Sequence, residues 1–202
     1  MTPKLRTGRD FDEVLVASEL SEEALALYAE HHEPDTYAKA LIQHNQHMDT
    51  IRLLAHALPR REAVWWAWSC ASKVAGEEPA EVIQAALNAT RDWVADPTDE
   101  HSRNAMEKAE QADMGTPAGC AALAAFLSGD SLAPPEIDPV EPSEFVGAKA
   151  VAGSIILAAV SQEPEKAEEK YVEFIEEGLG VADKVNLFLP PEDTEAQTNG
   201  WD

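Results

Sequence analysis

The sequence predicts an all-α fold, in which antiparallel helical hairpins pack as a bundle or as a solenoid within a single domain. Three observations lead to this prediction. Apolar residues recur at spacings of three and four over most of the 202-residue chain. Proline or glycine separates these periodic segments. The alternation of apolar and polar residues that is typical of half-buried strands is missing from the sequence.

The chain begins with two short expected elements. Residues 11–17 fit a short helix or an extended segment, because a run this short has no decisive period. A helix is expected next, with Ser18 or Ser21 as its N-cap and acidic residues in its first turn. Pro34 is expected to end that helix.

A long helix is then expected over residues 36–58. Asp35 or Thr36 is suited to cap it. One apolar stripe runs along this segment at helical spacing through Tyr37, Leu41, His44, Met48, Ile51, Ala55 and Leu58.

The next helix is expected to organise the core. Pro59 fits its first turn, and residues 53–75 hold three of the five tryptophans. Its apolar surface runs all round, which predicts a helix buried on both sides. One face is formed by Val64, Trp65, Trp68, Ala71, Ser72 and Ala75, and the opposite face by Trp66, Ala67, Cys70 and Val74. We predict that Trp65 and Trp68 are buried; an aromatic ligand cage is the alternative.

Three more helices are expected before the proline-rich segment that begins at residue 129. They are expected over residues 80–96, 100–112 and 118–127. Thr98 or Asp99 is suited to cap the second of them. The small residues of the third permit close contact between helices.

Residues 129–143 contain four prolines and few helix formers, which predicts an extended connector. It is expected to lie along the surface, anchored by Leu132, Ile137 and Val140. The alternative is that a partner protein recognises its proline run in an extended form.

The C-terminal part is expected to add a buried helix up to Val160 and another over residues 165–177. Gly178 and Gly180 are expected to end the latter. Residues 181–189 then form a short packed segment, so that the domain covers residues 1–189. Residues 190–202 are expected to be a disordered acidic tail.

The formal charge of −23 narrows the classes of partner. Nucleic acids and anionic membrane surfaces need clustered lysine and arginine, so both are excluded as partners. A protein partner remains, and the charge favours a basic one, although a salt-rich habitat explains the same charge. The longest apolar run, over residues 145–160, is interrupted by Lys149 and is too short for membrane insertion.

The cysteines and the N-terminus point to the cytoplasm. Cys70 and Cys120 both lie in apolar helical patterns, which predicts buried free thiols in a reducing compartment. The first residues lack the apolar run of a secretory signal.

Catalytic and cofactor motifs are not recognisable in the sequence, and we expect no cofactor. His44 and His47 stand three residues apart, and with Asp49 or Glu33 they are the one candidate metal site. Because His44 falls within the apolar stripe, packed histidines are the favoured interpretation.

Arg60 and Arg61 stand out in so acidic a chain. They occupy a helix start, where the helix dipole disfavours positive charge, so that some group should compensate them. We expect at least one to clamp helix ends through a carboxylate; contact with an acidic group of a partner is the alternative. The candidate interaction or clamp residues are therefore Arg60, Arg61, Trp65, Trp66 and Trp68.

The glutamates of residues 165–177 recur at helical spacing. They are expected to form a solvated face, and a docking surface for a basic partner is the alternative.

Three segments together resemble an uncharacterised bacterial all-helical family. They are HALPRREAVWWA at residues 56–67, WVADP at residues 93–97, and the alanine-rich stretch from Thr116 to Val160. The resemblance covers most of residues 50–180 and brings no catalytic residues with it. Members are sometimes encoded near type VI secretion genes, which implies an accessory or adaptor role.

Two functional hypotheses follow. The first is a non-enzymatic cytoplasmic protein-interaction module, such as an adaptor or a chaperone-like accessory of a secretion system. The second is a metal-dependent enzyme or a metal-binding protein that uses the region of His44 and His47.

Overall fold

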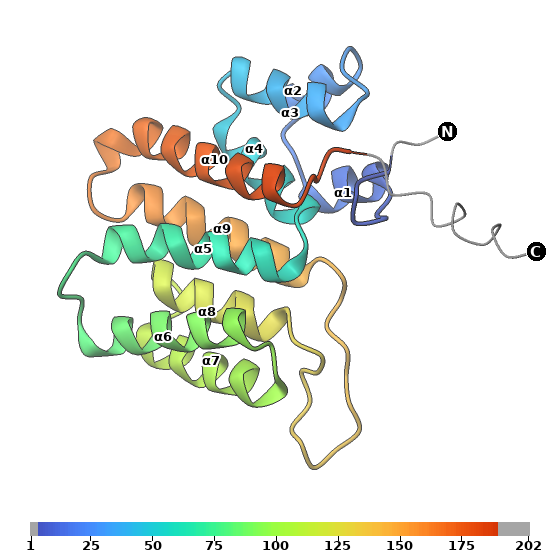
Figure 1. Ribbon diagram of the computed structural model, residues 1–202. Coiled ribbons are helices and arrows are strands. Elements are labelled where there is room, and N and C mark those ends of the chain that lie inside the picture. The colour runs from blue at the N-terminus through green and yellow to red at the C-terminus, as the bar shows by residue number, and fades with distance from the viewer. Residues whose placement is uncertain (1–3, 190–202) are drawn as a thin grey trace, which may run out of the picture.

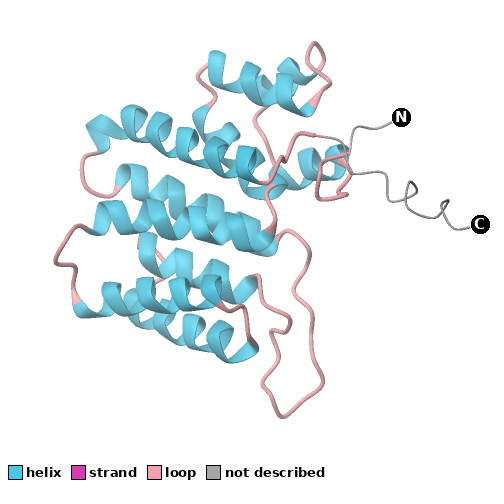
Figure 2. Ribbon diagram, viewed as in Figure 1, coloured by secondary structure: helices cyan, strands magenta, loops and turns pink. Residues whose placement is uncertain are grey.

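The computed structural model describes residues 4–189, and within that range it is built from helices (Figures 1 and 2). The predicted tail at residues 190–202 lies outside the described residues. The described part has ten α-helices, one 3-10 helix and no named strand, so the all-α prediction is confirmed. The elements are α1 (Phe11–Ser18), α2 (Glu22–Tyr28), α3 (Pro34–Gln43), α4 (His47–Ala57), α5 (Arg60–Ala75), α6 (Glu81–Ala95), α7 (Asp99–Ala112), α8 (Pro117–Leu127), α9 (Val146–Val160), η1 (Pro164–Lys166) and α10 (Ala167–Lys184).

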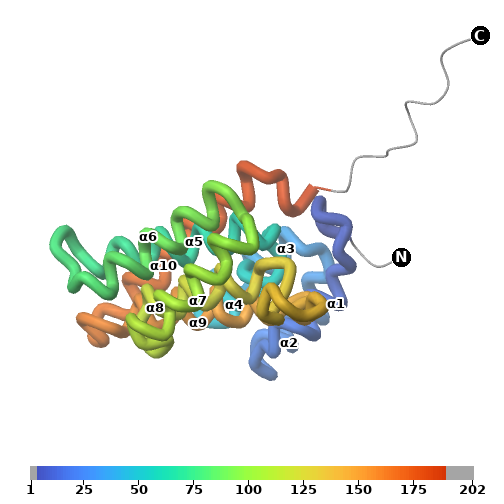
Figure 3. Tube along the Cα trace, turned by 90° about the horizontal axis from the view of Figure 1, so that it is seen from below, coloured from blue at the N-terminus to red at the C-terminus, as the bar shows by residue number. Residues whose placement is uncertain are grey.

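The helices stack in two layers. Helices α6, α5 and α10 lie side by side in one layer, and α8, α9 and α4 lie in the other (Figures 1 and 3). Helix α7 packs against α6 and α8 at one end of the stack, while α1 and α3 pack against α4 at the other. Both layers are therefore in contact with α5, which packs against α6, α8, α9 and α10.

The expectation that α5 is buried on both sides is confirmed, but the burial of its tryptophans differs from the prediction. Trp66 has no exposed surface, and its indole Nε1 donates to the carbonyl oxygen of Phe174 at 2.9 Å. Trp65 and Trp68 pack against the core and remain half-buried. The prediction failed because the broad apolar pattern of this helix does not show which face α10 covers.

The predicted end of the last helix at Gly178 and Gly180 is wrong, because α10 continues through both glycines to Lys184. A Cβ atom built on Gly178 lies 2.6 Å from Cζ2 of Trp66. Glycine at this position therefore allows α10 to approach the largest buried side chain of α5. The residue serves close packing rather than helix termination.

The expected continuous helix over residues 36–58 is also wrong. Helix α3 ends at Gln43, and α4 begins at His47. Asn45 between them has φ 55°, a left-handed conformation that asparagine tolerates better than most residues. The amide of Gln46 donates to the carbonyl of Leu41 at 2.8 Å and closes the turn. The apolar spacing of the sequence continues past this turn, so periodicity alone did not reveal the break. The two members of the expected stripe beside the turn, His44 and Met48, are exposed.

Several helix starts agree with the sequence. The hydroxyl of Ser21 caps α2, and the hydroxyls of Thr98 and Thr116 cap α7 and α8. The ambiguous segment at residues 11–17 is a helix, α1, capped by the side chain of Asp10.

The start of α3 differs from the prediction. Pro34 is the first residue of α3 rather than the end of the preceding helix, in the position where a missing N–H costs least. The N-cap residue is Glu33, so Asp35 and Thr36 lie inside the first turn.

The connector between α8 and α9 projects from the stack as a long loop (Figure 1). Its three expected anchors are exposed instead: Leu132 by 36%, Ile137 by 60% and Val140 by 54%. The base of the loop is closed by the amide of Leu132, which donates to the carbonyl of Val140 at 2.8 Å. Ser131, Ala133 and Pro142 are buried near this base. The apolar side chains in the loop face solvent because the loop leaves the body of the protein.

Candidate functional site

A groove opens on the layer formed by α6, α5 and α10. Its volume is about 350 Å³, within the range of ligand and peptide pockets. Each of the three helices contributes to its lining, which consists of Arg61, Glu62, Trp65, Val94, Val181, Lys184 and Val185.

The floor of the groove is apolar and its rim carries charge. The indole of Trp65 lies beside three valines, and Nζ of Lys184 stands 5.8 Å from the centre of a Trp65 ring. This is within the range of a cation–π contact. Within residues 4–189 the Lys184 ammonium has no ion pair, so its hydrogen-bond donors are available to a bound group.

Arg61 fixes one wall of the groove. Its Nε donates to the carbonyl of Val94 at 2.6 Å, and its Nη2 donates to the carbonyl of Ala95 at 3.1 Å. These carbonyls end α6, where the helix dipole favours positive charge. The guanidinium therefore joins the start of α5 to the end of α6, using backbone carbonyls where the sequence suggested a carboxylate.

Of the five candidate residues predicted from the sequence, Arg61 and Trp65 meet in the groove. Trp66 points to the interior, toward α10, and is part of the core. Trp68 is half-buried against the core. Arg60 is exposed and lines a different, smaller cavity.

The residues of the groove that sequence reasoning missed come from α6 and α10. Val94 lies in the segment expected to be a helix over residues 80–96, but its neighbour across the groove was not predictable. Val181 and Lys184 belong to the part of α10 beyond Gly178, where the helix was expected to have ended. In a helix that continues through residue 184, Val181 and Lys184 lie about one turn apart on one face. This spacing is the feature of the sequence from which their shared face could have been predicted.

The two histidines of the metal hypothesis have different environments. Nδ1 of His47 lies 2.7 Å from a carboxylate oxygen of Glu168, whereas His44 is exposed at the turn after α3. Among residues 4–189, no group of three or more histidine, cysteine, aspartate or glutamate side chains is arranged to hold a metal ion. His47 instead joins α4 to α10.

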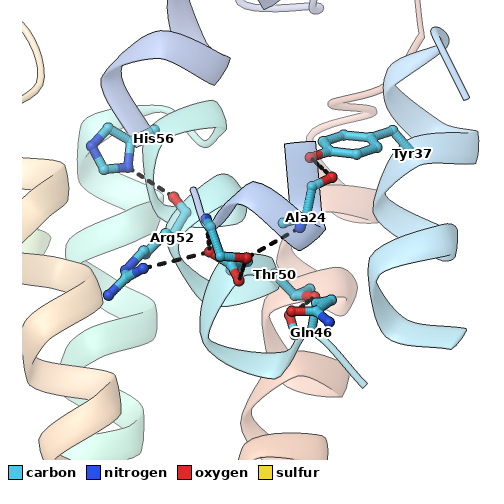
Figure 4. Close-up of polar contacts among 8 residues, drawn as sticks. Ala24, Tyr37, Gln46, Thr50, Arg52 and His56 are labelled. Atoms are coloured by element: carbon cyan, nitrogen blue, oxygen red, sulfur yellow. Dashed lines mark hydrogen bonds and ion pairs between the residues drawn. The ribbon is translucent and has the colours of Figure 1, made fainter. Parts of the chain in front are cut away.

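A polar cluster on α4 ties the N-terminal helices to the stack (Figure 4). The buried carboxylate of Asp49 accepts from the amide and the hydroxyl of Ser21, both at 2.9 Å, and Nη1 of Arg52 lies 3.5 Å away. Tyr37 donates its hydroxyl to the carbonyl of Ala24 at 2.8 Å, and burial raises the pKa of Tyr37 to about 12. Because these hydrogen-bonding groups are already engaged with one another, the cluster is structural.

Both cysteines are free and buried, as predicted. Burial, followed by the nearby Glu177 carboxylate, raises the pKa of Cys70 far above its ordinary value. Burial also raises the pKa of Cys120 to about 11. Neither thiol is ionised at neutral pH, so neither is an activated nucleophile.

Part of the glutamate face of α10 is engaged within the protein. Besides Glu168, which pairs with His47, two glutamates bind Lys73 of α5: its Nζ lies 2.7 Å from Glu173 and 3.1 Å from Glu177. Glu169 and Glu176 of α10 and Glu165 of η1 are exposed and make no ion pair within residues 4–189. No helix in the described part of the chain has the length and apolar character needed to cross a membrane.

The fold and the groove define an all-helical, two-layered protein with an apolar groove whose lining also includes the charged residues Arg61, Lys184 and Glu62. Residues 37–182 match the model of a family of unknown function (DUF6931), and the chain belongs to this family. This agrees with the resemblance to an uncharacterised family. Neither the curated proteins nor the solved structures gave a match.

Proposed function

We propose that this chain is a non-enzymatic, cytoplasmic protein-interaction module, and that the groove between α5, α6 and α10 receives a segment of its protein partner. The observation that carries the proposal is the combination of Trp65, Arg61 and Lys184 around an apolar floor. Tryptophan and arginine are the residues that most often dominate the energy of protein interfaces.

The groove favours a particular chemistry in the bound segment. An apolar side chain would cover Trp65 and the adjacent valines and would displace water from them. A carboxylate beside it would reach the Lys184 ammonium, which has no ion pair within the described residues. The segment is therefore expected to combine an apolar residue with an acidic one.

The charge of the whole chain acts at longer range. At a formal charge of −23, the protein attracts partners whose overall charge is positive and accelerates their association. A basic protein with one acidic and apolar segment would satisfy both requirements. An adaptor or chaperone-like accessory of a bacterial secretion system is the role we propose for such a module, in line with the genomic setting that the resemblance implied.

The test uses two synthetic peptides of equal length with the same leucine and phenylalanine positions. One carries glutamate at its polar positions, and the other carries lysine. Fluorescence anisotropy of the labelled peptides measures the binding of each at physiological ionic strength. We expect the glutamate peptide to bind more tightly, and Trp65→Ala to weaken it by about tenfold or more, since an interface hot spot is worth at least about 1–2 kcal/mol.

Lys184→Glu should reverse the preference between the two peptides. Lys39→Glu is the matched control, because Lys39 is an exposed lysine on α3, away from the groove. Equal binding of both peptides by the parent and all three variants would refute the groove as the binding site.

A further inference from the structure

A second, smaller cavity lies where the first turn of α9 meets α5 and α8. Its volume is about 10 Å³, which is room for a single oxygen-sized atom. The polar residues around it are Arg9, Arg60, Ser128 and Glu144. Gly147 and Ala148 of α9 also line it, and the rest of the lining is apolar: Ala55, Leu58, Ala63, Leu127 and Val151.

The first turn of α9 offers free backbone donors. Gly147 and Ala148 occupy the second and third positions of this 15-residue helix, and no side chain caps it. Within residues 4–189, neither of these two amides has a hydrogen-bond acceptor. Amides at a helix start attract anions, because the N–H groups and the helix dipole both present positive charge.

The hydroxyl of Ser128, the residue that follows α8, is a third hydrogen-bond donor. Its side chain is buried, with 7% of the residue exposed, and it lines the cavity. Its hydroxyl has no hydrogen-bond partner among the described residues. A Cβ on Gly147 would lie 2.4 Å from Oγ of Ser128, so only glycine lets this hydroxyl reach the first turn of α9.

Two guanidinium groups complete the site. Arg9 is held in place because its Nη1 donates to the carbonyls of His56 at 2.8 Å and Leu58 at 3.2 Å. Its Nε lies 3.5 Å from a carboxylate oxygen of Glu144, a distant pair. Arg60 is exposed and lacks a partner in the described part of the chain. The pKa of Arg9 is lowered mainly by burial, and the nearby positive charge of Arg60 lowers it further. Two cations, Arg9 and Arg60, therefore stand around a cavity whose lining contains a single carboxylate, that of Glu144.

We propose that the first turn of α9, with Ser128, Arg9 and Arg60, binds one phosphate-type oxyanion. One oxygen enters the cavity and accepts hydrogen bonds from the two amides and the Ser128 hydroxyl. The remaining oxygens face the arginines. The donors come from α5, α9, the end of α8 and the segment before α1. They outnumber what the two oxygens of a carboxylate can accept, which favours a tetrahedral oxyanion. The net charge of −23 opposes the approach of an oxyanion, and Arg9 and Arg60 offset it locally, within the distance of about 8 Å over which salt does not screen charges at physiological ionic strength.

The test is a titration of the full chain, labelled with ¹⁵N, with inorganic phosphate in a phosphate-free zwitterionic buffer. The amide signals of Gly147 and Ala148 should shift and saturate with one dissociation constant. Arg60→Ala should weaken binding by about tenfold or more, because it removes a charged hydrogen-bond donor from the oxyanion. Glu144→Gln should strengthen binding, because it removes the competing carboxylate.

Arg91→Ala is the control, because Arg91 is an exposed arginine on α6 that is paired with Asp92 and lies outside this cavity. Glycerol 3-phosphate, titrated in parallel, separates a free phosphate from a phosphate ester: the tighter of the two shows which form the site prefers. Unmoved Gly147 and Ala148 signals with both ligands, or equal weakening by Arg60→Ala and Arg91→Ala, would overturn the proposal. The outcome is independent of the groove between α5, α6 and α10, which shares none of these residues.

Discussion

Substitution of the two glycines of α10 by alanine should have opposite effects on stability. Both lie inside the helix, where glycine is less favourable than alanine by about 0.8–1 kcal/mol. A Cβ at position 180 meets no atom within 4 Å. Gly180→Ala should therefore raise the free energy of unfolding by up to about 1 kcal/mol.

Gly178→Ala adds the same helical preference, but its Cβ would lie 2.6 Å, 2.7 Å and 3.0 Å from three atoms of the Trp66 indole. Trp66 is fully buried and hydrogen-bonded to Phe174, so the ring cannot move away freely. Overpacking of this kind costs about 1–3 kcal/mol. The net result should be a loss of about 0–2 kcal/mol, so that the two variants differ by about 1–3 kcal/mol.

Urea denaturation of both variants beside the parent measures this difference directly. A further variant, Gly178→Ala with Trp66→Phe, removes the part of the indole that the new methyl group meets. The combined loss should be smaller than the sum of the two single losses. Equal stabilisation by Gly178→Ala and Gly180→Ala would refute the packing of α10 against Trp66.

Three further outcomes are expected. Trp66→Ala should lower the free energy of unfolding by about 3–5 kcal/mol and Trp65→Ala by clearly less, because Trp66 alone is fully buried, and the same urea titrations measure both. Arg61→Lys should lower the free energy of unfolding by less than about 1 kcal/mol, since the two hydrogen bonds of Arg61 are exposed. Arg60→Lys should leave thermal unfolding at low salt unchanged. Burial lowers the pKa of His56 in the folded protein below its ordinary value of 6.5. As the pH falls through 6.5, the unfolded chain is therefore protonated at this residue before the folded protein is. The stability contributed by the neutral ring is present above this pH and is lost below it. A His56→Gln variant should show a flatter dependence of the unfolding midpoint on pH in this window.

The helical class and most helix positions were predictable because proline, glycine and capping residues mark them locally. Ser21 and Thr98 cap helices where the sequence suggested, and Pro59 directly precedes α5. The errors occurred where a tertiary contact overrides a local signal. Gly178 resembles a helix end until Trp66 is placed against it. Asn45 separates two helices although the apolar spacing of the sequence continues past it.

The candidate groove was predictable only in part. Arg61 and Trp65 stood out in the sequence because basic and aromatic residues are scarce in this chain. The opposite wall, with Val181 and Lys184, depends on how α10 packs beside α5, which no local pattern encodes. The free amides of Gly147 and Ala148 are likewise visible only once Ser128 and the arginines are placed around them.

The central claim is that the groove between α5, α6 and α10 binds a partner segment over Trp65. The most direct measurement is ¹⁹F NMR of the protein labelled with 5-fluorotryptophan, with each signal assigned by a tryptophan-to-phenylalanine variant. On addition of the acidic, leucine- and phenylalanine-containing peptide, the Trp65 signal should shift while the signal of buried Trp66 stays in place. An unchanged Trp65 signal at peptide saturation would contradict the assignment of the groove.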